Sequence, residues 1–323
     1  MTSPFKIAVY ETGENGPHLF KAMMREIINE NALDIDVVGI TAEEICASRL
    51  LAPEYIGLIM PGRNRGQDYR DELGELGSAM IKAAAYRTGL CTQCICAGSY
   101  VLSSKVNWYN HFMPESSKIV DNAFALFEGT ALGAFDLWQD GYRSAARDAD
   151  IYTSNTLAAK VMDVTFAMQE QEISGHSLYW GGGVFIQNPG VYQQITPLVK
   201  HHATVCVPDA SPRPHRAFHR YVEPAAVIEF SLGESKHIFS NIHPEINGYL
   251  FENLFNATPK ARQNLDEFRQ DKANLMASDE LNKDIFRRFL SNCLANTQKN
   301  NGHNGTESVI DLKKPVAETA LTR

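Results

Sequence analysis

Hydrophobic residues in the first hundred positions form short apolar runs, and the segments between them have helical periodicity. The runs at 6–10, 34–40, 55–60 and 90–95 have the length and composition of buried parallel strands. Between the last two runs, residues 71–86 place apolar side chains on one helical stripe. Strands that alternate with helices at such short intervals predict a mostly parallel sheet flanked by helices, an α/β fold.

The pattern changes in the second half of the chain. Residues 106–194 hold short apolar segments between turn signals, which we interpret as the remaining strands with long surface insertions. Two strand-like runs within 225–242 meet at Gly233 and are typical of a hairpin. Helical periodicity returns over 261–297, and a polar tail follows. We therefore expect an α/β domain over 1–258, a C-terminal helical extension over 259–297 and a disordered tail over 298–323.

Composition and charge narrow the class of protein. The 323 residues are 44% hydrophobic, which is enough for one large core, and the formal net charge is −8. That charge argues against a general partner among nucleic acids or anionic membranes, which need a basic footprint. The N-terminal sequence does not have the pattern of a signal peptide, and six spread-out cysteines do not resemble a disulfide framework. We expect a cytoplasmic protein without a nucleic-acid or membrane partner.

Three cysteines lie close together in "CTQCICAGSYVLS", residues 91–103. A zinc site would need a second ligand pair, which the sequence lacks, so we expect no metal. A thioredoxin-type pair would place its first cysteine at a helix N-terminus, but Cys91 and Cys94 fall inside a predicted strand. The remaining chemical interpretation is a sharp strand-to-helix turn with Cys96 as nucleophile at the corner. A buried strand end with packed thiols explains the same residues, and this segment alone leaves both open.

A nucleophilic thiol needs a base and a group that orients the base. At a helix N-terminus the thiolate of Cys96 would be stabilised, and the N–H of Ala97 would face an oxyanion. His243 and Glu245 follow a strand-like run, so the histidine can reach the same edge of the sheet. A glutamate two residues later can bind the other ring nitrogen. The candidate catalytic residues are therefore Cys96, His243 and Glu245.

Four motifs in order resemble a known family. "MPGRNRGQDY" (60–69), "CICAGSY" (94–100), "YWGGGVF" (179–185) and "HPE" (243–245) resemble the class I glutamine amidotransferase-like superfamily. They are more narrowly similar to the family of the N-terminal domain of eukaryotic-type biotin-protein ligases, whose pattern is PGG, GICAGAY, GG-x-F and HPE. The resemblance covers roughly residues 6–255. It implies a flavodoxin-like fold and a Cys-His-Glu triad, without a cofactor.

The resemblance also implies substrate-binding residues. Its PGG turn corresponds to Pro61, Gly62 and Arg63, so the second oxyanion donor would be the N–H of Gly62 or Arg63, although arginine departs from the pattern. Gly181 and Gly182 fall in the glycine-rich motif, where a ligand could approach the backbone closely; a simple turn or bulge would also explain them. No "GRGR"-like biotin-binding motif is present, so the family name says little about biotin here.

We expect a cysteine-dependent hydrolase or amidotransferase-like enzyme that acts on the C–N bond of a small-molecule or peptide amide. A non-catalytic binding or regulatory module on the same fold is an alternative, because fold does not imply function. A cysteine peptidase or deglycase is another. The C-terminal helices could recruit a protein partner, although their apolar stripes favour docking on the domain.

Overall fold

The computed structural model describes most of the chain, and its largest element is one sheet. Within the described residues this sheet has 11 strands in the order β17-β10-β9-β12-β15-β16-β4-β3-β1-β2, with β8 paired to β9. The described residues are 5–11, 16–62, 66–109, 118–135, 152–154, 157–168, 171–202, 204–208 and 218–300.

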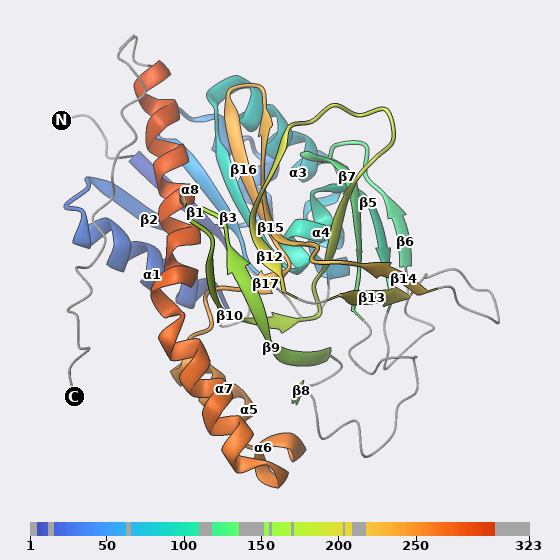
Figure 1. The fold of residues 1–323 in the computed structure, drawn as a ribbon. Helices are drawn as coiled ribbons and strands as arrows, with labels where there is room; N and C mark the ends of the chain where they lie inside the picture. Colours follow the sequence, from blue (N-terminus) through green and yellow to red (C-terminus); the bar gives the residue numbers. More distant parts are fainter. Residues whose placement is uncertain are drawn as a thin grey trace.

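One half of this sheet is parallel and corresponds to the apolar runs of the sequence (Figure 1). Its strands are β1 (Phe5–Tyr10), β2 (Ile35–Ile40), β3 (Tyr55–Met60), β4 (Cys91–Ile95) and β16 (Ser235–Ser240). Every residue of β3 and β4 is buried. Continuous apolar strands of this kind require cover on both faces of the sheet, and both faces are covered here.

Helices from distant parts of the chain provide that cover. The apolar stripe of α1 (Gly16–Glu30) packs with α8 (Asp279–Asn300) against one face. On the other face, α3 (Gly66–Thr88) and the short helices α2 (Ala42–Cys46) and η1 (Arg49–Leu51) contribute to a second core. The predicted α/β class with helices on both faces is thus confirmed.

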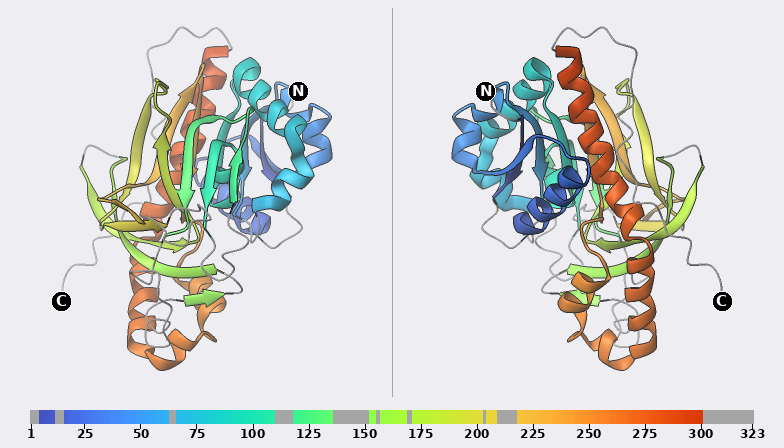
Figure 2. Two further views of the ribbon diagram at one scale, coloured as in Figure 1. Left: turned by 90° about the vertical axis from the view of Figure 1, so that its right-hand side faces the viewer. Right: turned by 90° about the vertical axis from the view of Figure 1, so that its left-hand side faces the viewer.

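The other half of the sheet is antiparallel and curls away from the parallel strands (Figure 2). It comprises β8 (Tyr152–Ser154), β9 (Leu157–Phe166), β10 (Ile173–Trp180), β12 (Ile195–His201), β15 (Ala225–Leu232) and β17 (Ile242–His243). The predicted hairpin at Gly233 joins β15 to β16, and Gly233 has φ +61°. Because a tight hairpin can join only antiparallel strands, it starts the antiparallel half. The prediction of a mostly parallel sheet therefore holds for one half, and the whole sheet is mixed.

Other strands between β4 and β15, a region predicted to hold the remaining strands and surface insertions, build two smaller sheets. One has the strand order β11-β7-β5-β6 and the other pairs β13 with β14. Their bounds are β5 (Ser103–Trp108), β6 (Lys118–Asp121), β7 (Phe127–Gly133), β11 (Gly183–Gln187), β13 (Val205–Pro208) and β14 (Phe218–Tyr221). Only Gly181 and Gly182 separate β10 of the large sheet from β11 of the small one, so the glycine-rich motif is the crossing point.

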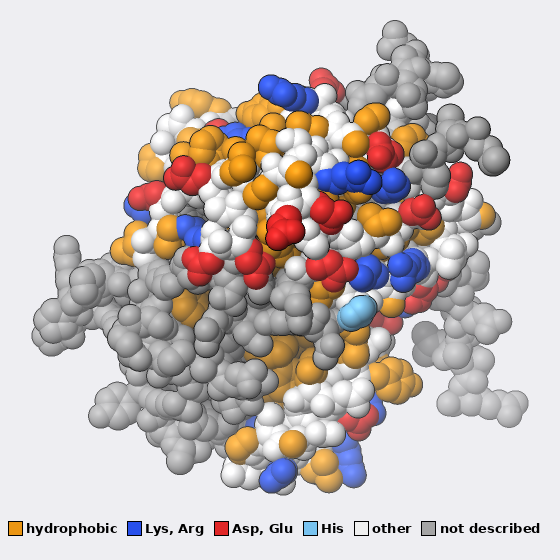
Figure 3. All heavy atoms as spheres, turned by 180° about the vertical axis from the view of Figure 1, so that it is seen from behind, with side chains coloured by type: hydrophobic (Ala, Val, Ile, Leu, Met, Phe, Trp, Pro, Cys, Tyr) orange, Lys and Arg blue, Asp and Glu red, His pale blue; other side chains and the backbone are white. Residues whose placement is uncertain are grey.

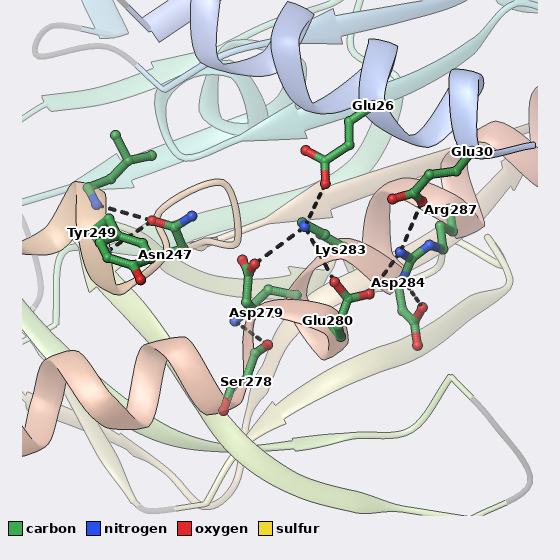
Figure 4. A network of polar contacts seen from close by, with 12 residues as sticks. Glu26, Glu30, Asn247, Tyr249, Ser278, Asp279, Glu280, Lys283, Asp284 and Arg287 are labelled. Carbon is green, nitrogen blue, oxygen red and sulfur yellow. Dashed lines mark hydrogen bonds and ion pairs between the residues drawn. The ribbon is translucent and has the colours of Figure 1, made fainter. Parts of the chain in front are cut away.

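The C-terminal helices are α5 (Gly248–Phe255), α6 (Pro259–Gln263), α7 (Leu265–Ala277) and α8. Lys283 and Arg287 of α8 bind carboxylates of α1: Lys283 Nζ lies 2.9 Å from Glu26, and Arg287 Nη2 lies 3.6 Å from Glu30 (Figure 4).

The predicted domain division at 258 stays a prediction, although α8 shares a hydrophobic core with α1. It continues to Asn300, inside the predicted tail, and residues 301–323 lie outside the described residues.

The face of the molecule drawn in Figure 3 carries charges of both signs. On the face seen in Figure 3, acidic and basic side chains lie among scattered hydrophobic ones. Among the described helices, none combines the length and the apolar composition needed to cross a membrane.

We predict that Arg288→Met destabilises the protein by about 2–4 kcal/mol, because it leaves a buried carboxylate without its main partner. Arg288 binds Glu229 of β15 through two hydrogen bonds of 2.8 Å each, and the side chain of Glu229 is buried. Urea unfolding measures the change. Arg269→Met is the control, because its ion pair with Asp266 is exposed and should contribute little. A loss no larger than that of the control would contradict the prediction.

We also predict acid destabilisation from two buried histidines. Burial lowers the pKa of His237 to about 3 and that of His201 to about 4, from an ordinary value of 6.5. Between pH 6.5 and the lowered pKa of each histidine, the unfolded chain therefore binds more protons than the folded chain. The free energy of unfolding falls as the pH decreases through that window. His237→Gln should reduce the slope of unfolding free energy against pH by about 1.4 kcal/mol per pH unit. Urea unfolding at a series of pH values measures the slope, and a slope that the substitution leaves unchanged would contradict the prediction.

Candidate active site

Cys96 lies at the corner between β4 and α4 (Ala97–Val101), where the sequence predicted a nucleophile. Its φ is +48° and its ψ is −111°, a backbone conformation that side-chain-bearing residues rarely adopt. Its amide donates a 2.8 Å hydrogen bond to the carbonyl of Ser240, at the end of β16. Gly98 is required here, because a Cβ would collide with the backbone of Met60. The helix has five residues, so the dipole expected to stabilise the thiolate comes from little more than one turn.

His243 ends the short strand β17 and pairs with Glu245. Its Nδ1 lies 2.7 Å from Glu245 Oε1, and both side chains are buried. Burial alone would lower the pKa of His243, but the Glu245 carboxylate, with a contribution from Cys96, raises that pKa well above its ordinary value. The carboxylate therefore favours protonation of the imidazole and fixes its orientation.

The structure brings the thiol and the imidazole together. Cys96 Sγ donates to the main-chain oxygen of Trp180 at 3.4 Å, and His243 Nε2 lies 3.3 Å from the same oxygen. Gly62 touches both groups: a Cβ at that position would lie 2.8 Å from His243 Cε1 and 3.5 Å from Cys96 Cβ. A larger residue at 62 would displace the ring, so glycine is a steric requirement of this site.

The glycine-rich segment forms another wall. Gly181 accepts a hydrogen bond from the hydroxyl of Tyr100 at 3.4 Å, and Gly182 accepts one from Tyr179 at 2.8 Å. The carbonyl of Gly183 is bound by the side-chain amide of Asn241. A Cβ at Gly182 would collide with the backbone of Asn241. Gly181 and Gly182 thus lie beside the Cys96–His243 pair.

The contributions of Trp180, Tyr100 and Asn241 were not predicted from the sequence. All three residues lie inside or beside the four motifs, but their contributions depend on a carbonyl, a hydroxyl and an amide whose directions no local pattern reveals. The indole of Trp180 also packs beside His243, with ring centroids 5.7 Å apart.

The other predicted residues are placed as follows. Ala97 is buried and is the first residue of α4. Arg63 lies outside the described residues. Cys94 is fully buried, and that burial raises the pKa of its thiol, as befits a packed rather than a reactive group. Within the described parts of the chain, no group of three or more His, Cys, Asp or Glu residues is arranged to hold a metal ion.

We predict that Glu245→Gln lowers the pKa of His243 below its ordinary value of 6.5, because burial remains after the compensating charge is removed. Titration of the imidazole Cε1–H resonance by NMR measures both proteins, and the other histidines serve as internal controls. An unchanged titration of His243 would show that the carboxylate does not hold its proton.

Comparisons with known proteins place this chain in a family. The family model described as "Biotin-protein ligase, N terminal" matches residues 36–315. No curated protein matches the sequence. A solved structure described as glutamine amidotransferase is similar at 12% identity and a TM-score of 0.38, covering 74% of this chain and 90% of its own.

A second solved structure is the glutaminase domain of Trypanosoma brucei CTPS with bound acivicin. It is 10% identical with a TM-score of 0.40, covering 75% of this chain and 87% of its own. Neither likeness bears on activity. The family match spans most of the sequence and includes the segments that carry Cys96, Trp180 and His243. The chain therefore belongs to the family of the biotin-protein ligase N-terminal domain.

Proposed function

We propose that this protein is a cysteine-dependent enzyme that cleaves a C–N bond in a carboxamide, with Cys96, His243 and Glu245 as its catalytic residues. One observation carries the proposal: the thiol and the imidazole meet at one carbonyl oxygen, and a carboxylate 2.7 Å away orients the imidazole. Covalent catalysis of acyl transfer requires these three groups: a nucleophile, a base within reach of it, and a group that orients the base.

The reaction begins when His243, in its neutral form, takes the proton of the thiol. Sulfur then forms a bond to the carbonyl carbon of the amide, and the carbonyl oxygen becomes an oxyanion. The C–N bond breaks as the imidazolium gives its proton to the leaving amine, which leaves an acyl thioester on Cys96. Water, deprotonated by His243, attacks the thioester, the carboxylic acid leaves, and the proton returns to sulfur.

Main-chain donors stabilise the oxyanion in this proposal. The N–H groups of Ala97 and Gly62 are the candidates, since one follows the nucleophile and the other contacts both Cys96 and His243. Cys96 is 5% exposed and His243 is 6% exposed, so charge develops in surroundings with little water. Electrostatic stabilisation is stronger in such surroundings than in water.

A non-catalytic binding module is the second candidate, and the hydrogen bond from Cys96 to Trp180 favours it. That bond leaves the thiol facing a carbonyl rather than open space. Against it stands the His243–Glu245 pair, because a buried charged pair is costly and a scaffold has no use for it.

All six cysteines are free, which suits the cytoplasm, where we place the protein.

We predict that Cys96→Ala lowers amide turnover roughly a thousandfold or more while leaving the fold intact. The assay follows ammonia or amine release from a panel of glutamine, asparagine, peptide amides and peptides, with glycated thiols added to detect a deglycase. Cys46→Ala is the control, since Cys46 lies on α2 and belongs to none of the four motifs. Full turnover by the Cys96 variant would refute the assignment. A panel without any turnover by the wild-type protein would favour the binding module.

A further inference from the structure

Four successive carbonyl groups cross the site, and each is bound by a side chain. The Trp180 oxygen faces Cys96 and His243, the Gly181 oxygen binds Tyr100, the Gly182 oxygen binds Tyr179, and the Gly183 oxygen binds Asn241. The last three hold the strand crossing between β10 and β11 in place. The first differs from them, because it engages groups that take part in the proposed reaction.

The observed position of the Trp180 carbonyl opposes that reaction. A carbonyl oxygen accepts hydrogen bonds, so it favours the neutral thiol of Cys96 over the thiolate. It also lies 3.4 Å from the sulfur, within the space that an attacked carbonyl group would approach. An oxyanion cannot bind beside it, because two negative oxygens repel each other.

The backbone at the next residue gives this peptide a second position. Gly181 has φ +76°, in the left-handed region that favours glycine. Rotation of the single peptide between Trp180 and Gly181 by about 180° would bring φ of Gly181 to a negative value, as in the relation between type II and type I turns. The same rotation turns the Trp180 C=O away from Cys96 and turns the Gly181 N–H toward it.

We propose that the Trp180–Gly181 peptide is a two-position switch of the active site. In the observed position its C=O caps the thiol; in the rotated position its N–H becomes a further oxyanion donor, beside those of Ala97 and Gly62. The bonds from Tyr100, Tyr179 and Asn241 confine the rotation to this one peptide. The role of the rotated N–H as an oxyanion donor rests on the proposed function, but the rotation itself can be tested without a substrate.

The test is the rate at which iodoacetamide alkylates Cys96, located by peptide mass spectrometry. Sulfur bonds to the methylene carbon, iodide leaves, and the thiol proton passes to the buffer. Gly181→Ala disfavours positive φ and so favours the rotated position. The expected rate increase is about tenfold, equivalent to about 1.4 kcal/mol in the equilibrium between positions. Gly181→Asn tolerates positive φ better and should give a smaller increase.

A matched glycine supplies the control. Gly190 has φ +80°, and a Cβ added there would meet no atom within 4 Å. Gly190→Ala therefore introduces the same strain away from the site and should leave alkylation unchanged. Gly181→Ser, which shares alanine's preference for negative φ, replaces Gly181→Ala if that variant unfolds in a thermal scan. Equal rates in the wild type and the alanine variant, or equal increases with alanine and asparagine, would overturn the switch.

These outcomes separate the switch from the enzyme. Faster alkylation of the alanine variant, together with a panel that yields no amide turnover, would support the switch and reject the proposed reaction. Turnover that depends on Cys96, together with an alkylation rate insensitive to residue 181, would support the reaction and reject the switch.

Discussion

The hydrogen bond from the Cys96 amide to the Ser240 carbonyl joins the two halves of the site. It continues the parallel ladder of β4 and β16 by one residue beyond the pair of Ile95 with Ser240. His243 follows Ser240 by three residues, so the bond sets the position of the base relative to the nucleophile. It also helps to hold Cys96 at φ +48°, a strained conformation that persists only where its surroundings determine it.

How much of the fold could be predicted depends on whether burial shows in the local pattern. Strands β3 and β4 are buried throughout, so their apolar runs were recognisable. By contrast, β10 begins with one exposed and three partly buried residues, which include Gly175 and His176, and is buried only over 177–179. Its pairing with β9 on one side and β17 on the other depends on segments far along the chain. No local periodicity encodes such partners, so the antiparallel half was not predicted beyond the hairpin at Gly233.

The candidate site divides in the same way. Cys96, His243 and Glu245 could be predicted because the thiol, the imidazole and the carboxylate are side-chain groups that the sequence names directly. The order of the four motifs along the chain supported the assignment. The carbonyl of Trp180 could not, because every residue has a carbonyl and only the three-dimensional fold gives it a direction. Asn241 was equally hidden: its amide binds Gly183 and lies 3.2 Å from the His201 ring, contacts that cross from one sheet segment to another.

The observed position of the Trp180 carbonyl, in which it caps the thiol of Cys96, has a physical reason. When His243 is protonated on both ring nitrogens, its Nδ1–H binds Glu245 and its Nε2–H needs another partner, because a buried donor without one costs about 1–3 kcal/mol. The Trp180 oxygen satisfies that donor and the thiol together when no substrate is bound. A ligand that displaces it must therefore offer an acceptor at the same place, which an amide carbonyl does and a hydrocarbon does not. Under the proposed function, the cap that blocks the thiol at rest also selects for the functional group that the thiol attacks.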